Sequence, residues 1–208
     1  MGVRMEKQLL DLGTKIVAAV IVMIVHEFPK TIVYYKMDQD SSKRSLKNAL
    51  RVQHYIDPIG LIFCIATSGG FSKPYMYRIK DKKLNKALGI TGYLSLALVY
   101  SFSVLALKFI FGVTSINGAF QYASTIGIIG IILTHLCFNL AFISFGMFLV
   151  NLFPIATFDM GNIIAGVSPM KFFEYLRKDY FMKVILVFVL MFGFTSSIGE
   201  IALSILLG

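Results

Sequence analysis

Four long apolar stretches dominate this sequence and restrict what it can fold into. They cover residues 12–35, 87–111, 123–155 and 184–207, and each exceeds the roughly 18 apolar residues that cross a bilayer as a helix. Of the 208 residues, 57% are hydrophobic and 15% are charged. We therefore expect an all-α polytopic membrane protein with about four transmembrane helices, built as one integral membrane domain over residues 1–208.

The basic residues predict the topology. A fifth apolar stretch, residues 56–71, is short and interrupted by glycine, and the loops on both sides of it are rich in lysine and arginine. Because short basic loops stay on the cytoplasmic side, this stretch should enter and leave the membrane from that side as a re-entrant element. Both chain termini then lie outside. We expect the bends of the element at Pro58, Gly60, Gly69 and Gly70.

Two short segments complete the predicted fold. Residues 74–79 contain two tyrosines and no helix signals, which favours a brief strand in a short β-hairpin beside the re-entrant element. Residues 167–179 begin with Ser168-Pro169, a suitable cap and first turn for an interfacial helix. Its lipid-facing side chains should be Phe172, Phe173 and Leu176.

The net charge of +9 does not indicate nucleic-acid binding. The basic residues gather in the loops between apolar segments, where membrane topology and anionic headgroups explain them. We therefore expect membrane lipids as partners and no nucleic acid. The two cysteines, Cys64 and Cys137, lie in apolar stretches without the spacing of metal ligands.

A histidine and a glutamate, His26-Glu27, lie inside the first apolar stretch. Ionisable groups at such depth cost roughly 2.5–3.5 kcal/mol each, so they are usually paired and functional. Residue 30 shares a helix face with residue 26, and a histidine there would complete the His-Glu-x-x-His motif of zinc proteases. The residue is Lys30.

With further blocks in order along most of the chain, the sequence resembles the site-2 protease family of intramembrane zinc metalloproteases, in particular its compact bacterial branch without a PDZ domain. The blocks are HEFPK at 26–30, HYIDPIG at 54–60, SGGFSKP at 68–74, GYLSL at 92–96 and NLFPIATFDMGNII at 151–164.

The resemblance implies a site and a location. His26 and Asp159 would be zinc ligands, and Glu27 would be the general base. The protein would lie in the bacterial cytoplasmic membrane with its motif side facing the cytoplasm.

The sequence departs from the family's pattern where the chemistry would take place. Lys30 replaces the second zinc histidine, Tyr93 and Leu96 replace the proline and asparagine of Gly-Pro-x-x-Asn, and Met160 replaces the glycine after the aspartate. Catalytic zinc generally needs three protein ligands. A protonated lysine opposes metal binding, and leucine forms no hydrogen bond with a substrate backbone.

Two residues have alternative interpretations. Lys30 either pairs with Glu27 and Asp159, taking the electrostatic role of the metal, or extends toward the inner interface. We expect the pairing. His54, at the mouth of the re-entrant element, either serves as a third zinc ligand or faces solvent and headgroups.

Two functions follow from these interpretations. The first is a catalytically impaired pseudoprotease that holds no cofactor and binds a membrane segment or a membrane-anchored partner protein. The alternative is an active intramembrane zinc metalloendopeptidase that cleaves a membrane-anchored substrate in regulated intramembrane proteolysis.

Overall fold

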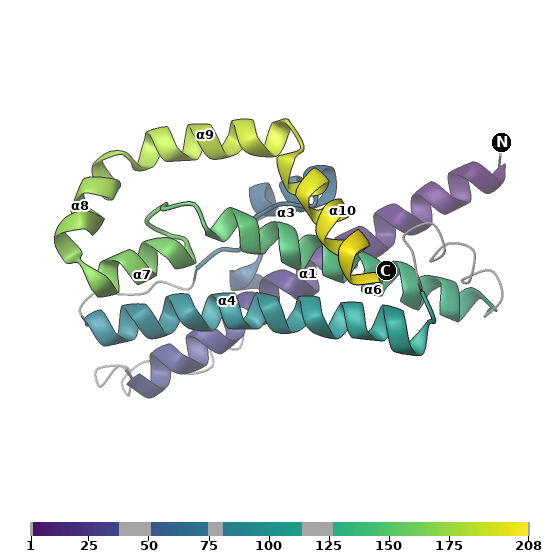
Figure 1. Ribbon diagram of the computed structural model, residues 1–208, viewed down its shortest axis with the longest axis horizontal. Helices are drawn as coiled ribbons and strands as arrows, with labels where there is room; N and C mark the ends of the chain where they lie inside the picture. The colour runs from purple at the N-terminus through teal and green to yellow at the C-terminus, as the bar shows by residue number, and fades with distance from the viewer. Residues whose placement is uncertain (1, 38–50, 75–80, 114–126, 208) are drawn as a thin grey trace.

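A computed structural model describes residues 2–37, 51–74, 81–113 and 127–207, and these residues form helices and connecting loops without a strand (Figure 1). The expected strand at 74–79 lies, apart from Pro74, outside the described residues. The all-α class is confirmed. The helices are α1 (Gly2–Met37), η2 (Val52–Tyr55), α3 (Pro58–Thr67), α4 (Lys82–Leu105), η3 (Ala106–Ile110), α6 (Gly127–Asn151), α7 (Asp159–Val167), α8 (Pro169–Arg177), α9 (Asp179–Met191) and α10 (Phe194–Leu207).

Three helices are long and apolar enough to cross a membrane, namely Gln8–Met37, Lys82–Ile110 and Gly127–Asn151. The fourth expected span is not one straight helix. It consists of α9 and α10, which are bent by 58° at a break between them. The break contains Gly193, whose φ of 70° lies in the left-handed region that ends helices. By length and composition, the described part of the chain therefore has three spans, or four if the bent pair is one span.

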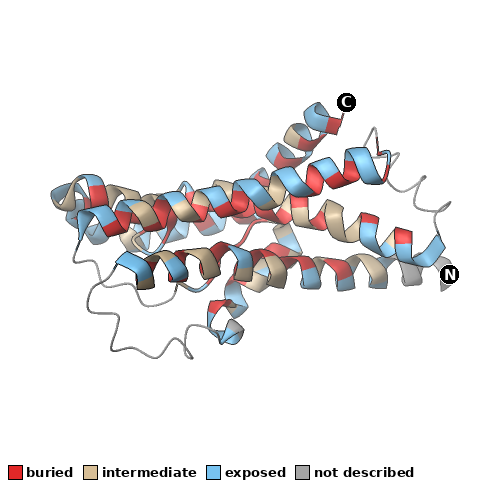
Figure 2. Ribbon diagram, turned by 90° about the horizontal axis from the view of Figure 1, so that it is seen from below, coloured by how far each residue is buried: buried red, intermediate tan, exposed pale blue. Residues whose placement is uncertain are grey.

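The surface of the bundle is apolar, as integral membrane helices require. On α4, Leu98, Phe102 and Phe109 of the adjoining η3 turn are largely exposed. Buried residues instead gather on the faces that the long helices turn toward one another (Figure 2). This distribution is compatible with an integral membrane protein, because lipid tails cover exposed apolar side chains at no cost.

The fifth apolar stretch folds back on itself and forms a hairpin of α3 and the return segment 68–74. Asp57 caps α3, because its Oδ1 accepts hydrogen bonds at 2.9 Å from the backbone N–H groups of Ile59 and Gly60. The return segment runs along α3, since Gly60 faces Phe71 and Gly70 faces Cys64. Lys73 N–H then donates to the Tyr55 carbonyl at 3.0 Å.

Entry and exit of this hairpin therefore lie together, as expected for a re-entrant element. The expected bends are partly wrong. Pro58 is the first residue of α3 and Gly60 lies inside that helix, so both belong to the descending limb. The chain reverses at Ser68, which adopts φ 55°, followed by Gly69 and Gly70.

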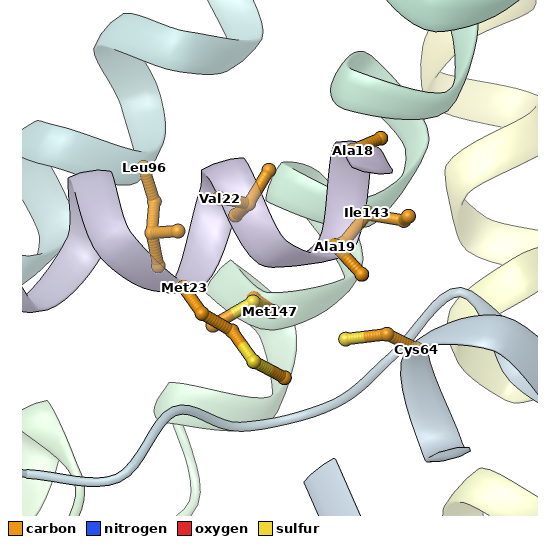
Figure 3. Close-up of a cluster of buried hydrophobic side chains, with 8 residues drawn as sticks. All are labelled: Ala18, Ala19, Val22, Met23, Cys64, Leu96, Ile143 and Met147. Carbon is orange, nitrogen blue, oxygen red and sulfur yellow. The ribbon is translucent and has the colours of Figure 1, made fainter. Parts of the chain in front are cut away.

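An apolar core lies between the hairpin and the long helices. Met23 of α1, Leu96 of α4, Met147 of α6 and Cys64 of α3 all point into it (Figure 3). The three long helices and the hairpin thus share one buried cluster, which fixes the hairpin against the bundle.

The helix expected at 167–179 is present as α8. The Ser168 hydroxyl accepts a hydrogen bond from Lys171 N–H at 3.5 Å, as a helix cap does. Phe173 and Leu176 are exposed as expected. Phe172 is 6% exposed, so its predicted contact with lipid is wrong. It packs against the protein because it lies on the opposite face of this short helix from most of the charged residues.

Candidate functional site

The first half of the candidate site comes from α1. His26 and Lys30 are one helical turn apart, and Glu27 precedes Lys30 by three residues, so all three project from neighbouring positions of one face. Each of these residues is 1% exposed. The helix continues for seven residues beyond Lys30, which places the charged groups well inside the span.

Asp159 supplies the other half. α6 ends at Asn151, the chain turns, and Asp159 opens α7, where an acidic residue is favourable. The Asn151 side chain steadies the turn, because its Oδ1 accepts from Asp159 N–H at 3.4 Å and its Nδ2 donates to the Met147 carbonyl at 2.9 Å. Gly92 of α4 leaves the room for the Asp159 carboxylate, since a Cβ there would collide with it.

Lys30 pairs with both acids. Its Nζ donates to Glu27 Oε1 at 2.9 Å and lies 2.8 Å from Asp159 Oδ1. The contact with Asp159 is ionic and lacks hydrogen-bond geometry, so Oδ1 remains without a hydrogen bond. The expected pairing is therefore confirmed, and the alternative of an extended lysine at the inner interface is wrong, because two buried carboxylates hold the ammonium.

His26 completes the group. Its Nε2 lies 2.7 Å from Asp159 Oδ2, and its Nδ1 lies 2.7 Å from Ser72 Oγ and 3.2 Å from Glu27 Oε1. The Ser72 hydroxyl donates to Glu27 Oε1 at 2.8 Å, so its oxygen is left to accept from the ring. With this orientation of the Ser72 hydroxyl, both ring nitrogens face acceptors, an arrangement that favours the protonated imidazolium form of His26.

These five side chains, His26, Glu27, Lys30, Ser72 and Asp159, are called the charge cluster below. Two cations face two carboxylates, so its net charge is zero. Burial alone would raise the pKa of the Asp159 carboxyl, but Lys30 and His26 outweigh burial and hold that pKa below its ordinary value. The cluster joins α1, the exit of the hairpin and the start of α7.

As arranged, the charge cluster does not fit zinc. The two expected zinc ligands, His26 and Asp159, form a hydrogen bond directly with each other. A metal ligand must offer a lone pair to the ion, and here the lone pair is occupied by the shared proton. The Lys30 ammonium lies against the second oxygen of Asp159. In the part of the chain that the structure describes, no three His, Cys, Asp or Glu side chains are placed to hold a metal ion. Glu27 is likewise engaged by Lys30 and Ser72, and this leaves it poorly placed to act as a base on water.

The remaining predicted site residues lie apart from the cluster or beside it. His54 lies in η2 with its side chain exposed, whereas His26 is buried. Leu96 belongs to the apolar core between the hairpin and the long helices. Tyr93 is half-buried, donates from its hydroxyl to the Asn151 carbonyl at 2.7 Å and packs edge-on against Phe148.

Met160 is partly exposed and follows Asp159 on α7. Tyr93 thus supports the turn that presents Asp159, a role that the sequence interpretation did not assign to it. Ser72 and Gly92 were also missed as site residues, although both lie in blocks quoted for the family resemblance. The available signal for Ser72 was a hydroxyl two residues after the paired glycines 69–70.

No family model, curated protein or solved structure matches this chain. The resemblance to site-2 proteases therefore rests on the five sequence blocks alone, and the charge cluster is the structural feature that bears on function.

Proposed function

We propose that this chain is a site-2-protease-like pseudoprotease, an integral membrane protein that binds a membrane segment or a membrane-anchored partner without cutting it. The observation that supports this function is the position of Lys30 between Glu27 and Asp159. The ammonium places a positive charge where an active relative would hold a divalent metal. Its two carboxylate partners are therefore neutralised without a metal.

In this proposal the charge cluster holds the helices of the protease scaffold together but does not support metal-dependent hydrolysis. Zinc would supply a Lewis acid and an activated water, and Glu27 would serve as the base. Here Glu27 accepts hydrogen bonds from Lys30 and Ser72, and Asp159 is shared by Lys30 and His26. Removing these charges would strand their partners, which explains why a non-catalytic chain would retain them.

The location follows from the charge pattern and the resemblance. We place the protein in a bacterial cytoplasmic membrane, with the entrance of the hairpin and the charge cluster toward the cytoplasm. Lys82, Lys83 and Lys86 at the start of α4 and Lys171 of α8 are exposed at that end, where anionic headgroups favour them.

Metal content tests the proposed function. Protein purified in mild detergent without chelator should contain far less than one zinc per chain by elemental mass spectrometry. Lys30→His should raise zinc toward one per chain, because it supplies a third ligand one turn from His26 and removes the competing cation. The matched control is Lys36→His, an exposed change six residues further along α1 that should leave the zinc content low.

The opposite result would favour the active protease. Stoichiometric zinc in the unaltered protein that is lost on His54→Ala would contradict the pseudoprotease and identify His54 as the third ligand. Restored zinc in Lys30→His does not require restored cleavage, because Leu96 and Met160 still differ from the family's substrate-binding residues.

A further inference from the structure

α10 runs along the part of the bundle between the tip of the hairpin and the far end of α4. At its start, the hydroxyls of Thr195 and Ser196 donate to the Thr67 carbonyl at 3.1 and 2.6 Å. At its end, Leu207 packs in one cluster with Leu107 and Phe111. Glu200 lies on α10 between these two ends.

The depth of Glu200 follows from its neighbours. The adjacent Gly199 faces Phe142 and Phe145, which lie in the central turns of α6 (Gly127–Asn151). Figure 1 shows α10 beside that part of α6. Because α6 is one of the helices long and apolar enough to cross a membrane, we expect Glu200, beside its middle, to lie at the level of the hydrocarbon core.

Glu200 points away from the protein. The buried face of α10 consists of Thr195, Gly199, Leu203 and Leu207, at four-residue spacing. Glu200 is exposed, and so are Ile201 and Ile205 on the same outer side. A carboxylate is thus placed on a face that otherwise contacts lipid, where an unpaired charge is costly.

The other acids of the candidate spans are all neutralised within the chain. Asp11 pairs with Lys15 at 3.2 Å, Glu27 belongs to the charge cluster, and Asp179 pairs with Lys183 at 2.6 Å. Among the described residues, the Glu200 side chain has no ion pair or hydrogen bond. Glu200 therefore differs from the other acids of the candidate spans in having no counter-charge among the described residues.

We infer that the exposed face of α10 around Glu200 is the docking face for a partner's transmembrane helix that contains a lysine or arginine within its apolar stretch. Such a base supplies the missing counter-charge at the right depth. Ser197 and Ser204, three residues before and four after Glu200, are small and exposed, so a helix can approach closely. This docking face rests on the proposed function, because it names the kind of membrane segment that is bound.

A second copy of this chain does not offer a suitable base. On the candidate spans, Lys30 is held in the charge cluster, Lys15 pairs with Asp11, and Lys108 Nζ donates to the Leu206 carbonyl at 3.4 Å. The other described lysines of these spans lie in the first or last two turns of their helices. Charge complementarity therefore favours a different protein.

A synthetic peptide tests the docking face directly. The probe is a leucine-alanine transmembrane peptide with one central lysine, compared with the same peptide with a central leucine. Both are reconstituted with the labelled full chain in phosphatidylcholine liposomes, and association is measured by energy transfer. The lysine peptide should bind about five- to thirtyfold tighter, the range that polar contacts between membrane helices support.

Glu200→Gln should abolish this preference, whereas Glu174→Gln, the same change on the exposed face of α8, should preserve it. Glu200→Lys should reverse the preference toward a peptide with a central glutamate. Unfolding curves of each variant show that the fold is retained, as expected for an exposed position.

Equal binding of the two peptides, or an unchanged preference in Glu200→Gln, would overturn the inference. Association between copies of the chain without peptide, lost in Glu200→Gln, would overturn it in favour of a homodimer. Zinc content is measured on the same samples. A zinc-loaded protein that still prefers the lysine peptide would reject the pseudoprotease and keep the docking face.

Discussion

Lys30 is held by two carboxylates that come from distant parts of the chain. Glu27 precedes it on the same helix, and Asp159 reaches it from α7. Removing one buried charge leaves its partner uncompensated, whereas removing a matched set leaves neutral groups that pack at lower cost. The stability of the charge cluster should therefore depend on charge balance more than on any one residue.

We predict that Asp159→Asn alone lowers the free energy of unfolding by about 3–5 kcal/mol, because it strands Lys30 and weakens the bond to His26. The combined change Lys30→Met, Glu27→Gln and Asp159→Asn should cost much less. Denaturant titration in mild detergent measures both. Asp11→Asn removes a half-exposed ion pair and should cost less than about 1 kcal/mol. Equal losses in the single and triple variants would argue against the pairing.

The pairing of Lys30 could be predicted from sequence, whereas the role of Ser72 could not. Glu27 lies three residues before Lys30, and the block around Asp159 indicated that this acid lies opposite. Ser72 is 46 residues from His26 and reaches it only because the hairpin folds back onto α1. No local pattern encodes such a contact. Gly92 is similar, because its function is the space it leaves for Asp159.

At the scale of the elements, the hairpin is fixed at both ends. Ser72 holds its exit on α1, and Thr195 and Ser196 hold its tip through the Thr67 carbonyl. Gly146 of α6 lies against the backbone of Ser68 at the same tip. A side chain at residue 146 would push the tip away from the bundle, so the hairpin depends on a glycine in a neighbouring helix.

Gly146→Ala should therefore destabilise the protein by about 1–3 kcal/mol, the usual cost of overpacking, although alanine is the better helix former. Gly13→Ala on α1 is the matched control. A Cβ at Gly13 meets nothing within 4 Å, so this change should be neutral or stabilising by up to about 1 kcal/mol. Thermal unfolding followed by circular dichroism compares the two. A similar shift in both variants would contradict close packing at the tip.

The order and type of the elements could largely be predicted, because apolar length and basic loops indicate spans and their connections. The break between α9 and α10 could not. Residues 184–207 are apolar on both sides of Gly193, and hydropathy does not indicate whether two apolar helices continue in a straight line or are bent. The polar contacts of Thr195 and Ser196 with the hairpin tip appear only in the folded structure.

At the scale of the whole molecule, the bundle has two different ends. Lys82, Lys83 and Lys86 are exposed at the start of α4, and this helix runs from that basic end to η3 at the other. The hydrogen bond between Lys73 and Tyr55 closes the hairpin at its entrance. With the basic end in the cytoplasm, residues before and after the hairpin share one side of the membrane.

Single cysteines test this topology in a background that lacks Cys64 and Cys137. Gln53→Cys and Lys82→Cys, both at exposed positions, should resist an impermeant thiol reagent added from outside. Ser115→Cys, in the uncharged connection between the second and third long apolar stretches, should react and serves as the positive control. Reaction at only one of the first two positions would show that the chain crosses the membrane between them.

Asp159 follows His26 by 133 positions in the chain, and this separation also bears on how the protein is made. At typical synthesis rates of about 5–20 residues per second, α1 waits roughly 7 to 27 seconds in the membrane before α7 emerges from the ribosome. During that interval Glu27 is the only carboxylate available to both Lys30 and His26. α1 is thus inserted before Asp159 can neutralise its second buried positive charge. Nascent chains that stop before residue 159 would present a helix with an excess positive charge to membrane quality control.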